Sequence, residues 1–181
     1  MPKLRDTHQT YGAVSRWLHW LMAIAIFAMF ALGVWMRTLT YYHPYYHSAP
    51  QLHKSIGIVL LGLLFIRFLW RLVNTDPDDD HLTKFERLAS SVVHWGFYPL
   101  LLALFISGYL ISTADGRPIE PFGLFSVPAT LQLEHQEDIA GAIHRWLAYG
   151  IIALALLHTA AALKHHFIDR DTTLRRMWSG N

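Results

Sequence analysis

The sequence contains no cysteine, and this absence removes several kinds of chemistry. Without cysteine the chain cannot form a disulfide, ligate an iron–sulfur cluster through thiolates, or attach haem covalently through a CxxCH motif. Any haem in this protein must therefore be bound non-covalently, through histidine or methionine. The chain of 181 residues has twelve histidines, so imidazole ligands are plentiful.

Charged residues are few, at 15% of the chain, whereas hydrophobic residues make up 53% and the mean hydropathy is +0.25. This composition is too apolar for a soluble domain. Four apolar segments each reach the roughly 20 residues that a membrane-spanning helix needs. The expected spans are residues 14–37, 50–72, 88–112 and 138–165. We therefore expect residues 1–181 to form one integral-membrane domain, an all-α transmembrane four-helix bundle.

The formal net charge of +2 is distributed unevenly along the chain. Most lysines and arginines lie near the two termini or between the second and third spans. The exceptions are Arg37, Lys54, Arg117 and Arg145, which lie on the other side. Because positive residues favour the cytoplasmic side of a membrane, both termini are predicted to be cytoplasmic. This distribution does not suit a nucleic-acid-binding surface, and no nucleic-acid partner is expected. Between the last two spans, the proline-containing residues 113–138 are expected to cover the outer end as a lid.

Two histidines, His144 and His158, lie fourteen residues apart inside the apolar run 139–163. Fourteen helical steps of about 100° bring the second side chain to within roughly 40° of the first, and separate them by roughly 21 Å. One helix would thus direct two imidazoles the same way at two depths of the bilayer. Ionisable groups at such depths are costly and usually functional. We interpret them as axial ligands of two b-type haems stacked across the membrane.

The depth of the other histidines indicates their partners. His53 begins the second span at the outer side, at the depth of His144. His19 lies near the inner start of the first span, at the depth of His158. His94 in the third span lies at nearly the same depth, so spacing alone leaves it as a rival of His19. Ligation by two histidines fills both axial positions and favours electron transfer.

Two arginines are candidates for binding haem propionates at the inner level. Arg67 follows His53 by fourteen residues, which places a cation on the haem-facing side. Arg16 precedes His19 by three residues and could act in the same way. The alternative for both is an interfacial arginine that extends to the membrane surface.

The same fourteen-residue interval leads to two glycines. Gly33 follows His19 and Gly108 follows His94 at this spacing. A glycine at the level of the opposite haem would leave room for a flat macrocycle. The alternative is that these glycines allow the helices to pack closely.

Lys54 and Arg145 each directly follow a proposed outer ligand. They could neutralise haem propionates, or attract a small anion through a focused positive potential. Anchoring at the membrane interface is the alternative.

Seven short motifs occur in order along the chain. They are RWLHW (16–20), QLHKSIG (51–57), IRFLWRL (66–72), FGLFSVP (122–128), IHRWLAYG (143–150), LLHTAAALKHHF (156–167) and DTTLRRMW (171–178). This ordered set resembles the bacterial cytochrome b561 family over nearly the whole chain. The resemblance implies a four-helix cytochrome of the bacterial inner membrane with two non-covalent b haems. It places the ligands at His19, His53, His144 and His158, in preference to His94.

The resemblance also implies an activity, because the best-described type in this family is a superoxide oxidase. Such a protein takes electrons from superoxide at the periplasmic side and passes them to ubiquinone, giving dioxygen and ubiquinol. Lys54, Arg117 and Arg145 are the residues expected to steer superoxide to the outer haem. Three histidines are candidate proton donors to the quinone: His94, His165 and His166.

Two other functions remain open from the sequence. The chain could be a haem b membrane-anchor subunit that passes electrons between a partner dehydrogenase or hydrogenase and the quinone pool. It could also be a haem-free channel or transporter whose histidines relay protons. Such a channel would need further buried charges along a path, and the sequence offers few.

Overall fold

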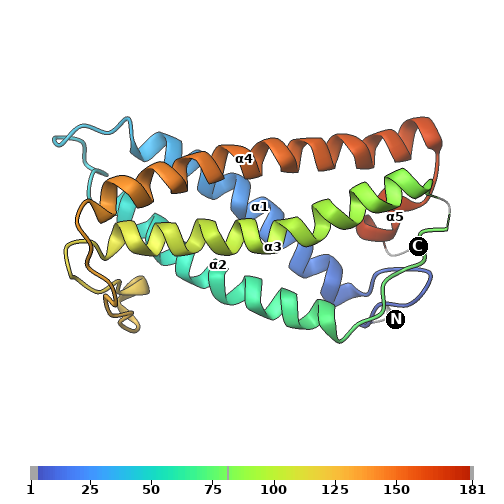
Figure 1. Ribbon diagram of the computed structural model, residues 1–181, viewed down its shortest axis with the longest axis horizontal. Helices are drawn as coiled ribbons and strands as arrows, with labels where there is room; N and C mark the ends of the chain where they lie inside the picture. Colours follow the sequence, from blue (N-terminus) through green and yellow to red (C-terminus); the bar gives the residue numbers. More distant parts are fainter. Residues whose placement is uncertain (1–3, 81, 180–181) are drawn as a thin grey trace.

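The computed structural model describes residues 4–80 and 82–179, and within them the chain is helical (Figure 1). The elements are α1 (Ala13–Met36), α2 (Ser48–Leu72), α3 (Lys84–Ser112), the 3-10 turn η1 (Pro121–Gly123), α4 (Gln136–Lys164), the π-helix η2 (His165–Asp169) and α5 (Thr173–Trp178). The described residues form no strand, and their extended pairing is an isolated bridge between Ile119 and Val127. The predicted all-α four-helix bundle is confirmed.

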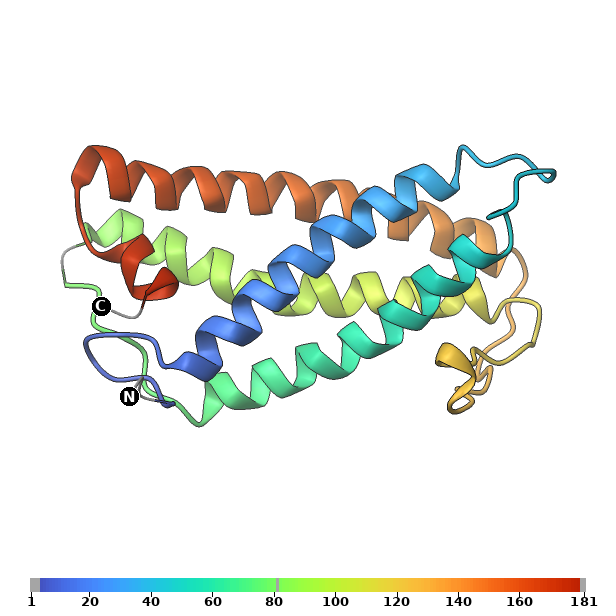
Figure 2. The ribbon, with the colours of Figure 1, turned by 180° about the vertical axis from the view of Figure 1, so that it is seen from behind.

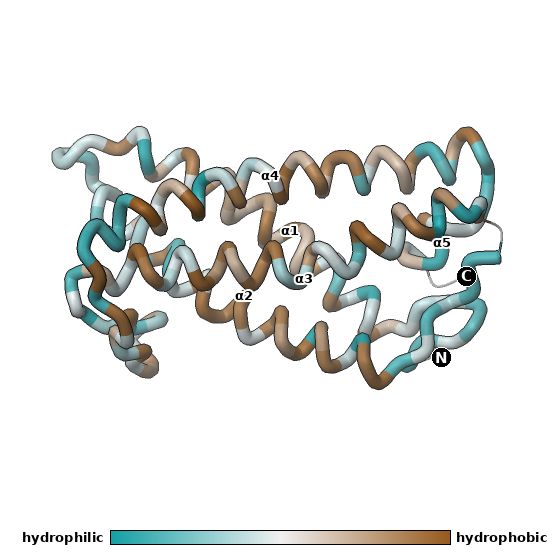
Figure 3. The backbone as a smooth tube through the Cα atoms, viewed as in Figure 1, coloured by the Kyte–Doolittle hydropathy of each residue, from teal (hydrophilic) through white to brown (hydrophobic). Residues whose placement is uncertain are grey.

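Four of these helices are long and apolar enough to cross a membrane: α1, α2, α3, and α4 continued through η2. Large apolar side chains stay exposed along them, such as Ile24 in α1, Phe65 in α2 and Leu157 in α4. Figure 3 shows apolar residues along the rods of the bundle and hydrophilic residues gathered toward its two ends. Because such a surface is stable against lipid and costly against water, the chain is a multi-pass membrane protein.

The third helix begins earlier than its expected span, at Lys84. Thr83 accepts a hydrogen bond from the backbone N–H of Glu86, and the Glu86 carboxylate accepts one from the backbone N–H of Thr83. This capping box satisfies donors that the first turn would otherwise leave unpaired. It adds a polar first turn before the apolar part of α3.

The helices run up and down, so that both termini lie at the same end of the bundle (Figures 1 and 2). We call this end, with residues 4–16, 73–80, 82–83 and 165–179, the terminal end. The opposite end, with residues 37–50 and 113–138, is the loop end. Helix α3 packs closely against α4, and α2 packs against α1 and α3, whereas α1 and α4 touch little. The connection after α3 lies at the loop end, with η1 beside the start of α2, and its Ile119 lines the cavity there; a lid over that end stays a prediction (Figure 2).

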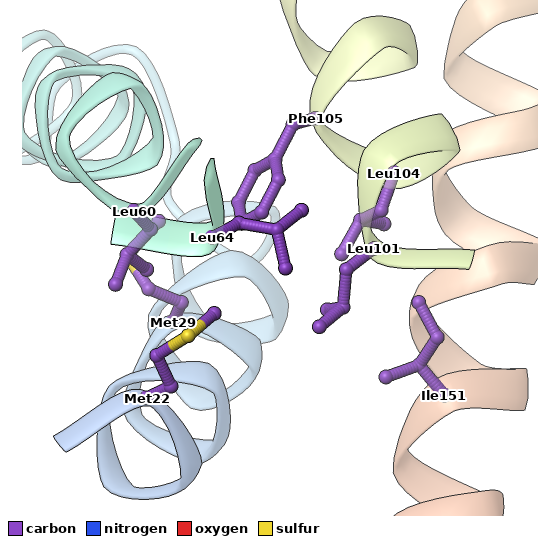
Figure 4. Close-up of a cluster of buried hydrophobic side chains, with 8 residues drawn as sticks. All are labelled: Met22, Met29, Leu60, Leu64, Leu101, Leu104, Phe105 and Ile151. Carbon is purple, nitrogen blue, oxygen red and sulfur yellow. The ribbon is translucent and has the colours of Figure 1, made fainter. Parts of the chain in front are cut away.

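The core is an apolar cluster at the middle of the bundle (Figure 4). Its buried members come from all four long helices: Met22, Met29, Leu60, Leu64, Leu101, Leu104, Phe105 and Ile151. In every helix these positions lie between the residues expected at the outer level and those expected at the inner level. The cluster therefore separates two polar levels, one toward each end of the bundle.

Short contacts hold the terminal end together. The indole N–H of Trp20 donates to the carbonyl of Met177 at 3.0 Å, and the ring of Trp20 lies edge-on to Trp178. Arg16 donates through Nη1 to the carbonyl of Trp178 at 3.2 Å. These bonds fasten α5 to the first turns of α1, beside the inner histidine level.

Candidate functional site

At the loop end, His53 of α2 and His144 of α4 face each other with ring centroids 6.2 Å apart. Both line a cavity of about 350 Å³ whose other walls are mainly apolar, among them Ile26, Phe105 and Ile151. Apolar cavities of about 300–1,000 Å³ with a few convergent polar groups are typical of ligand sites. The distant sequence positions predicted to share the outer level thus meet at one cavity.

The ring of His144 is held in a defined orientation. Its Nδ1 lies 2.9 Å from the carbonyl oxygen of Leu104 and 3.2 Å from Oγ of Ser107. A carbonyl only accepts, so Nδ1–H donates to Leu104, and the lone pair lies on Nε2. This is the usual arrangement of a metal-ligating histidine, in which the hydrogen bond of one nitrogen fixes the other as the ligand.

His53 shows a different feature. Its Nδ1 is buried and has no hydrogen-bond partner within the described part of the chain. Buried polar atoms are rarely left in this state, and such an atom often marks a functional group. The imidazole is therefore not explained as a hydrogen-bonded core residue.

At the terminal end, His158 of α4 lies between two other histidines. Its ring centroid is 6.3 Å from that of His19 and 5.2 Å from that of His94. A histidine nitrogen lies about 2 Å from a bound metal ion, so two imidazoles on opposite sides of one ion have centroids roughly 6 Å apart. His19 matches this separation as well as the loop-end pair does, and His94 is too close. The Nδ1 of His94 lies 3.4 Å from Oγ of Ser90 instead.

Arg67 reaches the histidines near the terminal end, where its Nη2 lies 3.2 Å from Nδ1 of His19. A guanidinium only donates, so Nδ1 of His19 accepts and its Nε2 carries the proton in this arrangement. Ligation of a metal through Nε2 requires this pair to separate. A carboxylate such as a propionate is a stronger partner for the arginine than a neutral imidazole, and would favour that separation.

Of the cations at the loop end, Lys54 lines the cavity beside His53. It forms no ion pair with any residue that the structure describes, and the same holds for the exposed Arg145. Arg117 is 3.4 Å from the carboxylate of Asp115, and its side chain is 84% exposed. The field of Arg117 is therefore partly cancelled, whereas those of Lys54 and Arg145 are not.

Two glycines lie directly against the loop-end imidazoles. A Cβ on Gly33 would be 3.2 Å from Cε1 of His53, and a Cβ on Gly108 would be 3.0 Å from Cε1 of His144. Both distances are shorter than ordinary van der Waals contact. The two glycines thus lie at the level of the loop-end histidines. Because each glycine lacks a side chain, the neighbouring imidazole can occupy the space beside it.

A polar cluster at the terminal end involves groups that the sequence alone did not connect. Nζ of Lys164 bridges Glu86 at 3.0 Å and Asp169 at 2.8 Å. His165 lies 3.1 Å from Asp169 and 2.7 Å from Asp171. Burial raises the pKa of Asp171, but hydrogen bonds from Thr173 and from His165 outweigh it and hold that pKa below its usual range. Nδ1 of His166, in contrast, is buried without a hydrogen-bond partner among the described residues.

These features fit a b-type haem at the loop end better than a bare proton path. One imidazole is preset with Nε2 as the ligand atom, the opposing one has an unsatisfied Nδ1, and an apolar cavity adjoins both. At the terminal end the same separation of imidazoles recurs, with an arginine beside them. Sequence reasoning could not have found the Leu104 carbonyl, because a backbone group has no signature in the sequence.

Comparison with known proteins agrees with this chemistry. Residues 10–180 match the family model of the prokaryotic cytochrome b561. The chain is 53% identical over 174 residues to cytochrome b561 homolog 2 of Escherichia coli K12, with 95% of this chain and 93% of that protein covered.

Two further relatives are more distant. A protein of Yersinia pestis named "Probable superoxide oxidase CybB" is 30% identical over 172 residues, covering 94% of this chain and 96% of that protein. Cytochrome b561 homolog 1 of Escherichia coli K12 is 28% identical over 166 residues, covering 89% and 92% respectively. The chain therefore belongs to the prokaryotic cytochrome b561 family of membrane electron-transfer proteins, which bind b-type haem.

Proposed function

We propose that the chain holds two non-covalent b haems and transfers electrons between the two faces of the membrane. His53 and His144 would hold the haem at the loop end, and His19 and His158 the one at the terminal end. The observation that carries this proposal is the pair of matching centroid separations, 6.2 Å and 6.3 Å, on the two sides of the apolar core. Each haem would supply reversible one-electron chemistry, and being held by two histidines would suit it to electron transfer.

We further propose that the electron donor is superoxide and the acceptor is ubiquinone. Two superoxide anions each lose one electron and become dioxygen, while one ubiquinone gains two electrons and two protons and becomes ubiquinol. Support comes from the name of the Yersinia pestis relative, and from Lys54, which lines the loop-end cavity and forms no ion pair among the described residues. Lys54 and Arg145 attract the anion, and Arg117 contributes less because of Asp115.

The direction of this transfer follows from the proposed orientation in the membrane. Positive residues gather at the terminal end, so this end faces the cytoplasm of a bacterial inner membrane and the loop end faces the periplasm. Superoxide then arrives at the loop end. His94, His165 and His166 lie toward the terminal end, and their imidazoles are the proposed donors of the protons that the quinone takes up. In this arrangement residues 1–181 act as one integral-membrane domain with lipid around it.

The decisive test is stopped-flow reduction of the purified protein by superoxide, with and without ubiquinone. We expect fast reduction of both haems, reoxidation when ubiquinone is present, and two haems per chain in the reduced spectrum. A haem-free protein would indicate a channel. Two haems without superoxide-dependent quinone reduction, together with a co-purifying soluble subunit, would indicate an anchor for a dehydrogenase or hydrogenase.

Gly108→Ala is expected to lower the occupancy or thermal retention of the loop-end haem and to spare the other one. The new Cβ would press on His144 at 3.0 Å, and overpacking of this kind costs about 1–3 kcal/mol. The measurement is haem content per chain after mild heating. Gly150→Ala in α4 is the matched control, because a Cβ there meets no atom within 4 Å. Equal haem loss in both variants would show that the effect is not steric.

Arg67→Gln is expected to lower the midpoint potential of the terminal-end haem, because a nearby cation favours the reduced form. A lost interaction of about 1.4 kcal/mol corresponds to about 60 mV for a one-electron couple. The measurement is a spectroelectrochemical titration that resolves both haems. Arg71→Gln is the control, since Arg71 already pairs with Asp76 at 2.7 Å. An equal shift of both potentials in the Arg67 variant would contradict the local placement.

A further inference from the structure

The connection after α3 folds back along the side of the bundle at the loop end. Nε2 of Gln51 donates to the carbonyl of Glu120 at 3.3 Å, and the backbone N–H of Phe122 donates to Oγ of Ser55 at 3.3 Å. Ser55 is about two turns into α2, roughly 10 Å along the axis from the helix start. Figures 1 and 2 show η1 displaced sideways from the ends of the helices. This segment therefore lies at the height of the first turns of α2.

The segment is a closed turn with a fixed shape. The backbone N–H groups of Ile119 and Val127 each donate to the carbonyl of the other, at 2.9 and 2.8 Å. At its tip, Phe122 has φ 53°, a left-handed conformation that residues other than glycine rarely adopt, and Gly123 follows with φ 70°. The backbone conformation at the tip is thus set by the turn and by the bond to Ser55.

The side chains of this turn divide into a buried set and an exposed set. Ile119 is 1% exposed and lines the cavity of His53 and His144. On the exposed side, Phe122, Leu124 and Phe125 keep 55%, 79% and 53% of their surface accessible. Three large apolar side chains within four positions are not typical of a loop that faces water.

The composition around these residues also suits lipid. Residues 121–133 contain no charged side chain. Beside the turn, α2 presents Leu52 and Val59, which are likewise exposed in the bundle. The apolar surface of the turn therefore continues the lipid-facing surface of α2. A water-soluble partner would need complementary polar or charged groups at the rim, and these thirteen residues offer no charge.

We propose that residues 122–125 are an interfacial anchor that inserts into the leaflet at the loop end. Phe122, Leu124 and Phe125 enter the boundary between headgroups and acyl chains, as the apolar faces of membrane-surface segments do. Because Ile119 of the same turn closes one wall of the loop-end cavity, insertion in lipid also keeps that wall in place. The anchor depends on the membrane and on the geometry of this turn, and it does not depend on the identity of the substrates.

The absence of native cysteine makes a direct test possible, because a single introduced cysteine is labelled uniquely. Leu124→Cys is labelled with the fluorophore NBD in the haem-loaded protein, in phospholipid nanodiscs. Leu157→Cys in the middle of α4 is the standard for lipid contact, and Glu134→Cys in the same connection is the standard for water. Phe125→Cys is a second test position, and the haem spectrum of each variant reports that it is folded.

We expect headgroup-proximal nitroxide lipids to quench the label at Leu124 at least about twofold more strongly than the label at Glu134, as shallow insertion requires. We expect aqueous cobalt ions to show the opposite order. Quenching of both test positions by cobalt alone, as at Glu134, would place the turn in water and overturn the proposal. Protection from both quenchers would also overturn it, by showing that a second copy or another protein covers the turn.

Discussion

Alanine in place of His53 or of His144 is expected to remove the loop-end haem and to leave the terminal-end haem bound. In the proposed function each of these two imidazoles would hold that haem, and among the described residues no other imidazole lies within ring contact of both. The apolar cluster between the two levels would isolate the proposed second haem from the change. Haem content should fall from two per chain to one. Alanine at His19 or His158 should have the reciprocal effect at the terminal end.

His94→Ala is the control that distinguishes His94 from His19 as the partner of His158. Its ring is nearer to His158 than that of His19 is, yet the 5.2 Å separation leaves too little space for a metal ion between them. We therefore expect His94→Ala to retain both haems. Haem content is measured by the pyridine haemochrome method, and circular dichroism reports helix content. Retention of two haems in His19→Ala, with loss of one in His94→Ala, would make His94 the ligand. Retention of both haems in all four ligand variants would refute the proposed site.

Reversing the charge at both Lys54 and Arg145 is expected to slow superoxide turnover about tenfold at low salt, because focused potentials raise the on-rates of anions by at least that factor. The difference should shrink as salt is added, since mobile ions screen the field. The measurement is the second-order rate constant for haem reduction by superoxide, at several ionic strengths. The haem spectrum should stay unchanged, because neither side chain is a proposed ligand.

Arg117→Glu provides the comparison for this prediction. Arg117 is already beside Asp115 at 3.4 Å, so its reversal should have a smaller effect than reversal at the cavity. If all three cations act only as membrane anchors, the double variant will show the wild-type rate and the wild-type salt dependence. That result would remove steering from the mechanism and leave the haem sites intact.

The membrane spans and the two levels of histidines are determined largely within single helices. The interval between His144 and His158 fixes a shared face and two depths, because an α-helix repeats its geometry with a constant twist and rise. The same rule places Gly33 and Gly108 near the outer level. The four apolar spans follow from composition and length alone, because each buries its backbone hydrogen bonds within itself. The fold class and the two levels were therefore predictable from local periodicity.

Contacts between helices are a different matter. Depth could not choose between His19 and His94, because both lie at the level of His158; their separations of 6.3 and 5.2 Å depend on how α1 and α3 pack against α4. In the same way, the sequence placed Arg67 near a propionate, and only packing brings it to Nδ1 of His19. Sequence spacing gives the depth of a residue along its helix axis. A metal site also depends on the distance and orientation between residues on different helices.

The loops depend most on tertiary structure. The sequence predicts that residues 113–138 cover the loop end, but only the bonds to Gln51 and Ser55 show where their turn lies, beside the first turns of α2. The terminal-end cluster likewise joins Glu86 of α3 to Lys164 at the end of α4. The sequence by itself determined the spans, the histidine spacing and the side on which charges gather, because these follow from the regular geometry of each helix. The tertiary structure decided which imidazoles face each other, which cations have no ion-pair partner among the described residues and where the turn lies, because these depend on contacts between segments far apart in the chain.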